Sequence, residues 1–452
     1  MNKLELVKVL KKEDAVKKIN NAIIVFYILM FLEGMLRKWV APQLSSLFFF
    51  IKDPVLIYMY YICWRFRLFP QTVLFRVSSI LAILYLFLSI TQMLINVSSF
   101  VISIYGWRNY FMFMPLAFIM EKHMGKKELI RFAKITCYLG IPIAILTYIQ
   151  YLNPPDAFIN RNVGENSGAG FTVIGNIVRP YGPFSFVTGM AFYTPSLLAM
   201  LLFNFFLPNK DRFLSKSMFF ICFCAFISNI AVSGSRGTFG IALIVIAFAF
   251  IGFLLLANNK KALQSLIIFL CGAIFAILIY VTVFSAEIDI MTQRFEQAGA
   301  SEGSAVDRIA TNFVSFEDIS TELSFWGQGI GLGSSGGSFL QTGTVQFNIA
   351  ESDWGKIVVE CGVFFGFMYI GYRMILCLYM VTGAVKGTLK GINPIPMVLV
   401  GFELQTLLYG QMVSTGIHLA YGWAFLGISL AINKMYANNL ELEERSLNSN
   451  NG

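Results

Sequence analysis

The sequence is poor in charged residues and in histidine, and each shortage argues against a class of protein. Only 13% of the 452 residues are charged, whereas a soluble domain usually has about a quarter, so the composition argues against a soluble fold. The two histidines, His123 and His418, are too few and too far apart for a histidine-based zinc site. Short alternating polar and apolar segments are also missing, which argues against a membrane β-barrel.

Cysteine is present but in a pattern that gives no disulfide framework and no metal-binding spacing. All seven cysteines fall in or beside apolar runs, as expected for small buried hydrophobic residues. A cleavable signal peptide is also not evident, because the first apolar run follows a long charged segment and has no small-residue cleavage site. That run is therefore interpreted as a retained membrane span.

Long apolar stretches recur between Ala22 and Ile432, and several reach the ~20 residues needed to cross a bilayer. We therefore predict an all-α polytopic membrane protein with about twelve transmembrane helices. The predicted spans are approximately 20–36, 46–64, 76–95, 101–120, 132–152, 188–207, 218–233, 238–257, 263–284, 356–380, 395–412 and 417–434.

Lysine and arginine in the short loops predict the orientation. The rich segments are the N-terminal leader 1–19 and residues 65–69, 121–134, 209–216, 258–261 and 385–390. With twelve spans they share one face with both termini, and the positive-inside rule makes that face cytoplasmic. Arg37 and Lys38 are exceptions to this rule, because they follow the first span and would lie on the opposite face. We expect an amphipathic leader at 1–19, a transmembrane domain at 20–434 and a polar, disordered tail at 435–452.

The opposite face carries two substantial loops, 153–187 and 285–355, the second lying between helices 9 and 10. Every cation in these loops and in the turn at 233–237, up to residue 350, is an arginine. These residues are Arg161, Arg179, Arg236, Arg294 and Arg308. The planar guanidinium fork matches phosphate and carboxylate oxygens, so the uniform choice indicates anion binding. Pairing with local acids such as Glu165, Glu287, Glu296 or Asp307 is the alternative.

Further charges fall at or near membrane depth, where they are costly and usually face the bundle interior or a water-filled cavity. They are Glu33, Lys52, Asp53, Arg108, Lys356, Arg373 and Glu403. Glu33, Arg108 and Glu403 are candidates either for structural ion pairs or for a functional site.

Four short motifs follow one another along the chain. They are VRPYGPFSF at 178–186, the SRG turn inside AVSGSRGTFG at 231–240, the glycine-rich FWGQGIGLGSSGG at 325–337, and the pair Glu360 and Gly362 on the next helix. The glycine segment contains GxGxxG, but no strand and helix surround it, so we do not interpret it as a nucleotide site. Its glycines instead favour a tight turn or close approach of the backbone to a ligand.

In order and spacing, these motifs resemble the O-antigen ligase and polymerase superfamily of integral-membrane glycosyltransferases. The resemblance covers most of the chain and is clearest over 178–366. It implies a polyprenyl-diphosphate-linked oligosaccharide as donor, bound in the bilayer at the outer face of a bacterial inner membrane. It implies neither a cofactor nor a metal, no nucleic acid, and other polysaccharide-assembly proteins as further partners.

The resemblance also implies roles for individual residues. Arg236 is expected to hold the diphosphate and stabilise the charge that develops on it, with Ser233 and Ser235 as hydroxyl donors. Arg108, Arg161, Arg179, Arg294 and Arg308 are the further candidates for binding the diphosphate or the glycan. The alternative for Arg236 is an interfacial arginine that snorkels to lipid headgroups.

Ligases of this superfamily typically carry a histidine at the start of the helix after the glycine segment, where this chain has Glu351. Glu351 is the candidate general base and Asp353 its substitute, although acids are also favoured in the first turn of a helix. A carboxylate is more similar to the polymerase branch, so a polysaccharide polymerase is the first expectation. A ligase, a flippase or anion transporter, and a non-catalytic assembly subunit remain alternatives.

Overall fold

The computed structural model describes most of the chain. The described residues are 3–164, 168–302, 324–334, 336–337, 340 and 352–450.

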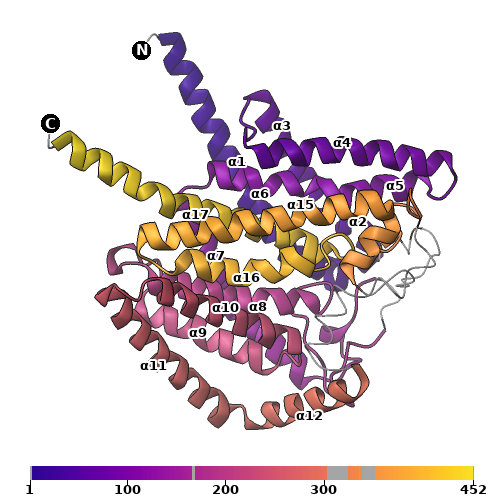
Figure 1. Cartoon of the computed structure of the whole chain (residues 1–452). Helices are drawn as coiled ribbons and strands as arrows, with labels where there is room; N and C mark the ends of the chain where they lie inside the picture. Colours follow the sequence, from indigo (N-terminus) through magenta and orange to yellow (C-terminus); the bar gives the residue numbers. More distant parts are fainter. Residues whose placement is uncertain are drawn as a thin grey trace.

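The described part of the chain is a bundle of helices with no strand, only an isolated antiparallel bridge between Thr172 and Val178. Its α-helices are α1 Lys3–Met35, α2 Ser45–Phe49, α3 Asp53–Arg65, α4 Val73–Leu94, α5 Phe100–Trp107, α6 Met114–His123, α7 Lys126–Leu152, α8 Thr188–Phe206, α9 Lys216–Ala231, α10 Arg236–Leu255, α11 Lys260–Val283, α12 Ser285–Glu302, α15 Asp353–Gly391, α16 Ile395–Tyr409 and α17 Gly416–Asn450. Its 3-10 and π helices are η1 Leu36–Val40, η2 Pro42–Leu44, η3 Arg108–Met112, η4 Phe158–Asn160 and η5 Asn209–Asp211. Figure 1 shows the long helices packed side by side, with both termini projecting from the same end.

Nine helical segments of the described chain are long and apolar enough to cross a membrane, and α9 and α16 are shorter apolar helices. The polytopic helical architecture is therefore confirmed. The predicted span 101–120 is not one helix, because α5 and α6 are joined by the π-helical turn η3. Helices thus occupy all twelve predicted spans, while the number of crossings stays a prediction.

Burial separates central helices from peripheral ones. Of the most apolar 18-residue window, 83% is buried in α8 and 89% in α17, but only 6% is buried in α11. Ile267, Ile274 and Leu278 of α11 are all more than half exposed. A continuous apolar face of this size needs an apolar surrounding, which a bilayer provides.

The chain extends as helix beyond two predicted boundaries. The leader 1–19 and the first span form the continuous helix α1 from Lys3. At the other end, α17 continues through most of the tail predicted to be disordered, as far as Asn450. The tail sequence LELEER consists of strong helix formers, which explains its helical backbone.

The two ends of the bundle differ in what they carry. We call the end with residues 153–187, the SRG turn and the glycine-rich segment 325–334 the loop end, and the other the terminal end. At the terminal end, Lys126 lies 2.8 Å from Asp211, which joins two of the lysine-rich segments. The structure thus gathers these segments, while their cytoplasmic location stays a prediction.

Arg37 and Lys38, the two exceptions to the positive-inside rule, lie at the loop end and have structural partners there. Arg37 donates to Glu33 at 2.7 Å, and Lys38 donates to the carbonyl oxygen of Gly182 at 2.8 Å. The Lys38 ammonium also lies 4.2 Å from the ring centroid of Tyr181. Because these contacts fix the end of the first span to the loop 153–187, its two cations have a reason to depart from the positive-inside rule.

Helix α15 is bent back on itself at Gly362, whereas a straight span was predicted over 356–380. Gly362 has φ 78° and ψ 164°, a conformation that lies outside the helical region. Asp353 and Arg373 form an ion pair at 2.5 Å, yet a straight helix would separate residues twenty apart by about 30 Å. The piece before Gly362 therefore folds back along the rest of α15, as the short turn of helix at the right of Figure 1 shows.

Candidate functional site

The loop 153–187 packs on the SRG turn through a small hairpin. Thr172 pairs with Val178, and the amide of Val173 donates to Ile177 at 2.7 Å. Gly234 of the SRG turn has φ 54°, and a Cβ there would overlap a methyl group of Val173. Glycine at 234 thus allows both the turn conformation and the contact with the loop.

The same contact brings two of the predicted arginines together. Arg179, which follows the hairpin, donates from Nη2 to Oγ of Ser235 at 2.8 Å. Ser235 is the N-cap of α10 and also accepts from the amide of Thr238 at 3.3 Å. Arg236 is the first residue of α10 and is half-buried. The structure therefore places Arg179, Ser235 and Arg236 at one helix N-terminus.

Gly237, which follows Arg236, is exposed. Among the described residues, a Cβ on Gly237 would come no closer than 3.7 Å to a neighbour, the nearest being Oγ of Ser235. Ser233 points elsewhere, because its hydroxyl donates to the carbonyl oxygen of Ile230 at 2.8 Å and is buried. Ser233 thus supports the turn, whereas Ser235, equally buried, joins the helix N-terminus to Arg179.

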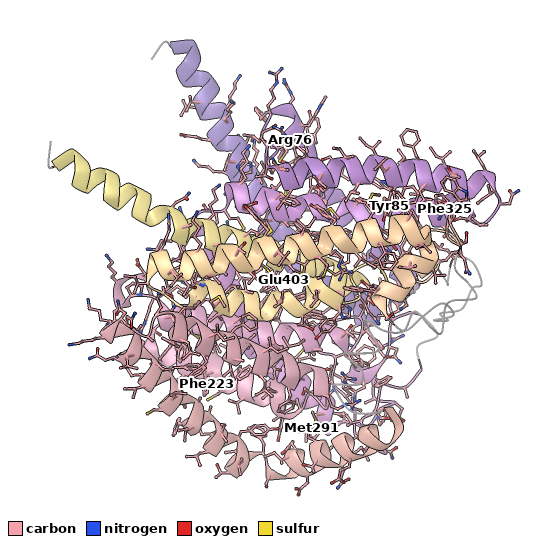
Figure 2. All side chains as sticks on the ribbon, viewed as in Figure 1. Arg76, Tyr85, Phe223, Met291, Phe325 and Glu403 are labelled. Atoms are coloured by element: carbon pink, nitrogen blue, oxygen red, sulfur yellow. The ribbon has the colours of Figure 1, made fainter. Side chains whose placement is uncertain are left out.

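Helix α12 flanks the SRG turn on the other side. A small cleft beside the turn is lined by Tyr151, Val173, Gly234, Glu287 and Met291, which joins α12 to the hairpin. Figure 2 labels Met291 on this helix at the edge of the bundle. Arg294 follows Met291 by three residues on α12, so its backbone belongs to the same region. The predicted site residue Arg308 lies outside the described residues.

Arg161 belongs to the hairpin side of the site through Tyr181. The Tyr181 hydroxyl donates to the carbonyl oxygens of Asn160 and Arg161, the latter at 2.8 Å. Burial raises the pKa of Tyr181, so this hydroxyl stays protonated as a donor at neutral pH. The Arg161 guanidinium lies 5.8 Å from the ring centroid of Phe158. The backbone of Arg161 is thus tied to Tyr181, two residues after Arg179 in the loop.

Arg108 lies apart from these arginines, and its contacts favour the structural ion pair that the sequence left open over ligand binding. It forms a two-pronged ion pair with Asp53 at 2.6 and 2.7 Å. Its guanidinium also lies 5.1 Å from the ring centroids of Phe50 and Phe113. Since the side chain is buried and its fork is occupied by a carboxylate, Arg108 is a structural residue.

The glycine-rich segment binds the bend of α15. Amides of Gly331 and Gly333 donate to the Glu360 carboxylate at 3.0 and 2.6 Å, and the Tyr110 hydroxyl donates to it at 2.8 Å. The amide of Gln328 donates to the carbonyl oxygen of Val359 at 2.8 Å. The backbone of the glycine-rich segment therefore makes a close approach, as predicted, but it approaches other parts of the protein and not a ligand. The described glycines contact helices α5 and α15.

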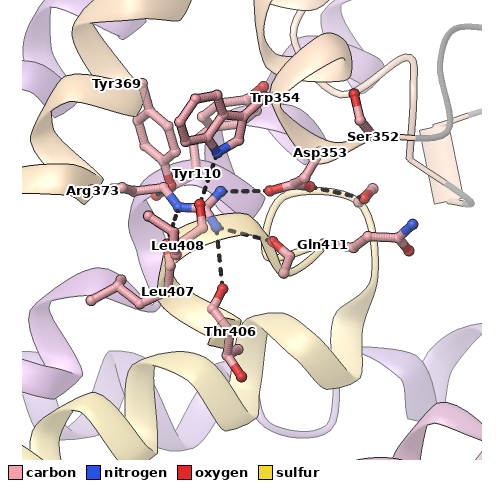
Figure 3. A network of polar contacts seen from close by, with 12 residues as sticks. Tyr110, Ser352, Asp353, Trp354, Tyr369, Arg373, Thr406, Leu407, Leu408 and Gln411 are labelled. Carbon is pink, nitrogen blue, oxygen red and sulfur yellow. Dashed lines mark hydrogen bonds and ion pairs between the residues drawn. The ribbon is translucent and has the colours of Figure 1, made fainter. Parts of the chain in front are cut away.

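Asp353 lies in a buried network rather than in an open site (Figure 3). Its carboxylate accepts from Arg373 at 2.5 Å and from the Ser414 hydroxyl at 3.2 Å, and it is fully buried. Arg373 also donates to carbonyl oxygens at the end of α16, those of Leu407, Thr406 and Gly410. A carboxylate held in this way cannot reach an acceptor hydroxyl, which argues against Asp353 as a general base.

The first candidate base, Glu351, lies outside the described residues. Its neighbour Ser352 is the buried N-cap of α15 and accepts from the amide of Gly355 at 3.0 Å. Lys356, one turn into this helix, is also buried. In the sequence it lies between the acids Asp353 and Glu360. The sequence marks Lys356 only as a charge at membrane depth. Its burial beside the start of α15 adds a cation to this region.

Comparison with known proteins does not name a family for the chain. No protein-family model matches the sequence, and no curated protein matches it. The residues and their geometry therefore carry the functional argument.

Proposed function

We propose that the protein is a membrane glycosyltransferase that polymerises lipid-linked polysaccharide repeat units. The donor is a polyprenyl-diphosphate-linked oligosaccharide, and transfer takes place at the outer face of a bacterial inner membrane with both termini in the cytoplasm. The observation that carries the proposal is the hydrogen bond of Arg179 to Ser235. It supports one anion site built from the loop 153–187 and the N-terminus of α10.

The chemistry of a diphosphate leaving group fits this site. A helix N-terminus carries partial positive charge and unpaired amides, and arginine forks add charge and paired donors. Negative charge accumulates on the diphosphate as the glycosidic bond breaks, so fixed cations at this position lower the barrier. Apolar helix surfaces such as α11 are suited to the polyprenyl tail.

A polymerase is preferred to a ligase because Glu351 stands where ligases of the resembling superfamily carry histidine. We propose Glu351 as the general base that removes the proton of the acceptor hydroxyl. The geometry supports it indirectly, because Asp353 is already engaged by Arg373 and Ser414.

Purified protein in liposomes, supplied with a polyprenyl-diphosphate-linked repeat unit, tests the proposal. A polymerase lengthens the lipid-linked chains and releases polyprenyl diphosphate in matching amounts. Protein-dependent movement of the glycolipid between leaflets without release would instead identify a flippase and overturn the catalytic proposal.

In this assay we expect Arg236→Lys to lower turnover by about a hundredfold, the effect of losing one preorganised donor to developing charge. Lysine keeps the charge but loses the bidentate fork. The matched control is Arg65→Lys, an exposed arginine at the terminal end, which should leave turnover unchanged. Full activity of Arg236→Lys would show that Arg236 only anchors the turn at the interface.

We expect Glu351→Gln to lower turnover by about 10²–10⁴-fold, the usual contribution of a general base. Glutamine keeps the size and hydrogen bonding of the side chain but cannot accept the proton. Asp289→Asn on α12 is the control for removing an exposed acid at the same end. Wild-type turnover by a folded Glu351→Gln protein would exclude Glu351 as the base.

A further inference from the structure

A cavity of about 670 Å³ lies at the terminal end, on the side of the bundle away from the proposed site. It is lined by the end of α6, the last turns of α15, the middle of α17 and the link between α3 and α4 at 70–72. Its volume falls within the roughly 300–1,000 Å³ typical of ligand pockets. Nothing in the proposed glycosyl transfer uses this cavity.

Three lysines converge on the cavity from three different helices. They are Lys122 of α6, Lys386 of α15 and Lys434 of α17, and all three are exposed. Lys122 is oriented by carbonyl oxygens of Leu68 and Phe69 at 3.0 and 2.8 Å. No acid forms an ion pair with them among the described residues.

One acid, Glu121, lines the cavity and is engaged by a hydrogen bond from the protein. Glu121 is buried and accepts from the Tyr379 hydroxyl at 3.0 Å. The cavity is lined by one carboxylate and three ammonium groups, so its net charge is positive. The side-chain nitrogen of Asn433 donates to the backbone carbonyl oxygen of Met380 at 2.9 Å. The buried side-chain oxygen of Asn433 has no hydrogen-bond partner in the described chain.

Part of the remaining wall is apolar. Phe118 and Leu430 are buried beneath it, so its accessible apolar surface comes from the ring of Tyr379, which is 41% exposed, and from Ala437. The ligand that fits is therefore amphipathic, with an anionic group for the lysines and hydrocarbon for this wall. A free inorganic anion would leave the apolar wall without a partner.

We propose that this cavity binds the headgroup of an anionic phospholipid from the leaflet at the terminal end. The phosphate lies among Lys122, Lys386 and Lys434, and the first carbons of the acyl chains lie on the ring of Tyr379 and on Ala437. Basic pockets between transmembrane helices on the cytoplasmic side are suited to such headgroups. The proposal is independent of the glycosyltransferase function.

The test is a titration of the full-length protein in neutral detergent with fluorescent phosphatidylglycerol, with phosphatidylcholine as the zwitterionic comparison. We expect at least tenfold tighter binding of phosphatidylglycerol, and binding that weakens as salt is added. The double variant Lys386→Gln/Lys434→Gln should bind phosphatidylglycerol about thirtyfold more weakly, the effect of two lysines at an anionic headgroup.

The matched control is Lys260→Gln/Lys261→Gln, two exposed lysines of α11 at the same end but outside the cavity. It should bind like the wild type. Equal weakening in both double variants would mean nonspecific attraction and would overturn the proposal. Competition by millimolar inorganic phosphate as effective as that by unlabelled phosphatidylglycerol would assign the cavity to a free anion and would also overturn it. Because the substituted lysines are exposed, both variants should retain the elution profile and circular dichroism of the wild type.

Discussion

Arg373→Met is expected to destabilise the protein by about 3–5 kcal/mol, the usual result of leaving a buried charge without its partner. The substitution removes the guanidinium that pairs with the Asp353 carboxylate at 2.5 Å and leaves its hydrogen bond from the Ser414 hydroxyl at 3.2 Å. The substitution also removes the hydrogen bonds that Arg373 donates to carbonyl oxygens at the end of α16. With a total stability of about 5–15 kcal/mol typical of domains, such a loss would lower the yield of folded protein.

Asp353→Asn should cost less, because the network is asymmetric. Without the carboxylate, Arg373 still donates to the carbonyl oxygens of Leu407, Thr406 and Gly410. The asparagine oxygen also remains available to Ser414. We expect a loss of about 1.5–3 kcal/mol, the contribution of a hydrogen bond to a charged group.

Thermal unfolding in detergent, followed by the loss of monomeric protein on size exclusion, measures both effects. Arg65→Met serves as the control for removing an exposed arginine. If Arg373→Met unfolded at the wild-type temperature, the network would not hold the bend of α15. If Asp353→Asn instead kept its stability but lost glycosyl transfer, Asp353 would return as the candidate base in place of Glu351.

The positions of the helices were predictable from the sequence because bilayer crossing imposes a strong local signal. A run of about twenty apolar residues is typical of a membrane-spanning helix, and helices occupy every predicted span. The turn at Gly234 and the helix start at Ser235 were likewise visible as a break between two apolar runs. These features depend on neighbouring residues, which a sequence displays directly.

What the sequence did not predict depends on partners far apart in the chain. Arg108 was assigned to the ligand because Asp53, fifty-five residues earlier, could not be recognised as its partner. The bend of α15 was missed because a glycine inside an apolar run is compatible with a straight helix. The charges at membrane depth were the sequence feature that indicated buried ion pairs. Most of them form such pairs: Glu33 with Lys52, Asp53 with Arg108, and Asp353 with Arg373.

Glu403 differs from these paired charges. It lies in the middle of the bundle in Figure 2, fully buried on α16. Both of its carboxylate oxygens are without a hydrogen-bond partner in the described chain. A buried carboxyl group without a hydrogen-bond partner is costly, which sets Glu403 apart from the paired charges. Its sequence position alone gave no indication of which role it has.

Gly362→Ala is expected to release the glycine-rich segment from α15 and to cost at least about 2 kcal/mol. A residue with a side chain at φ 78° is strained by about 1–2 kcal/mol, and overpacking adds about 1–3 kcal/mol. The added Cβ would overlap the carbonyl oxygen of Phe325 and lie 2.8 Å from the amide nitrogen of Gly327. The strain can be relieved by moving residues 325–333 away from Glu360, which undoes the bonds from Gly331 and Gly333.

Hydrogen exchange separates this local release from general destabilisation. In the wild type the amides of Gly331 and Gly333 are held by the Glu360 carboxylate, so the peptide spanning 324–334 should exchange slowly. In Gly362→Ala the same peptide should exchange much faster, while peptides of the central helix α8 keep their protection. The matched control is Gly371→Ala in the same helix, where a Cβ meets no atom within 4 Å and alanine is the better helix former. Unchanged exchange of the 324–334 peptide in Gly362→Ala would mean that the bend tolerates a side chain and does not require glycine at 362.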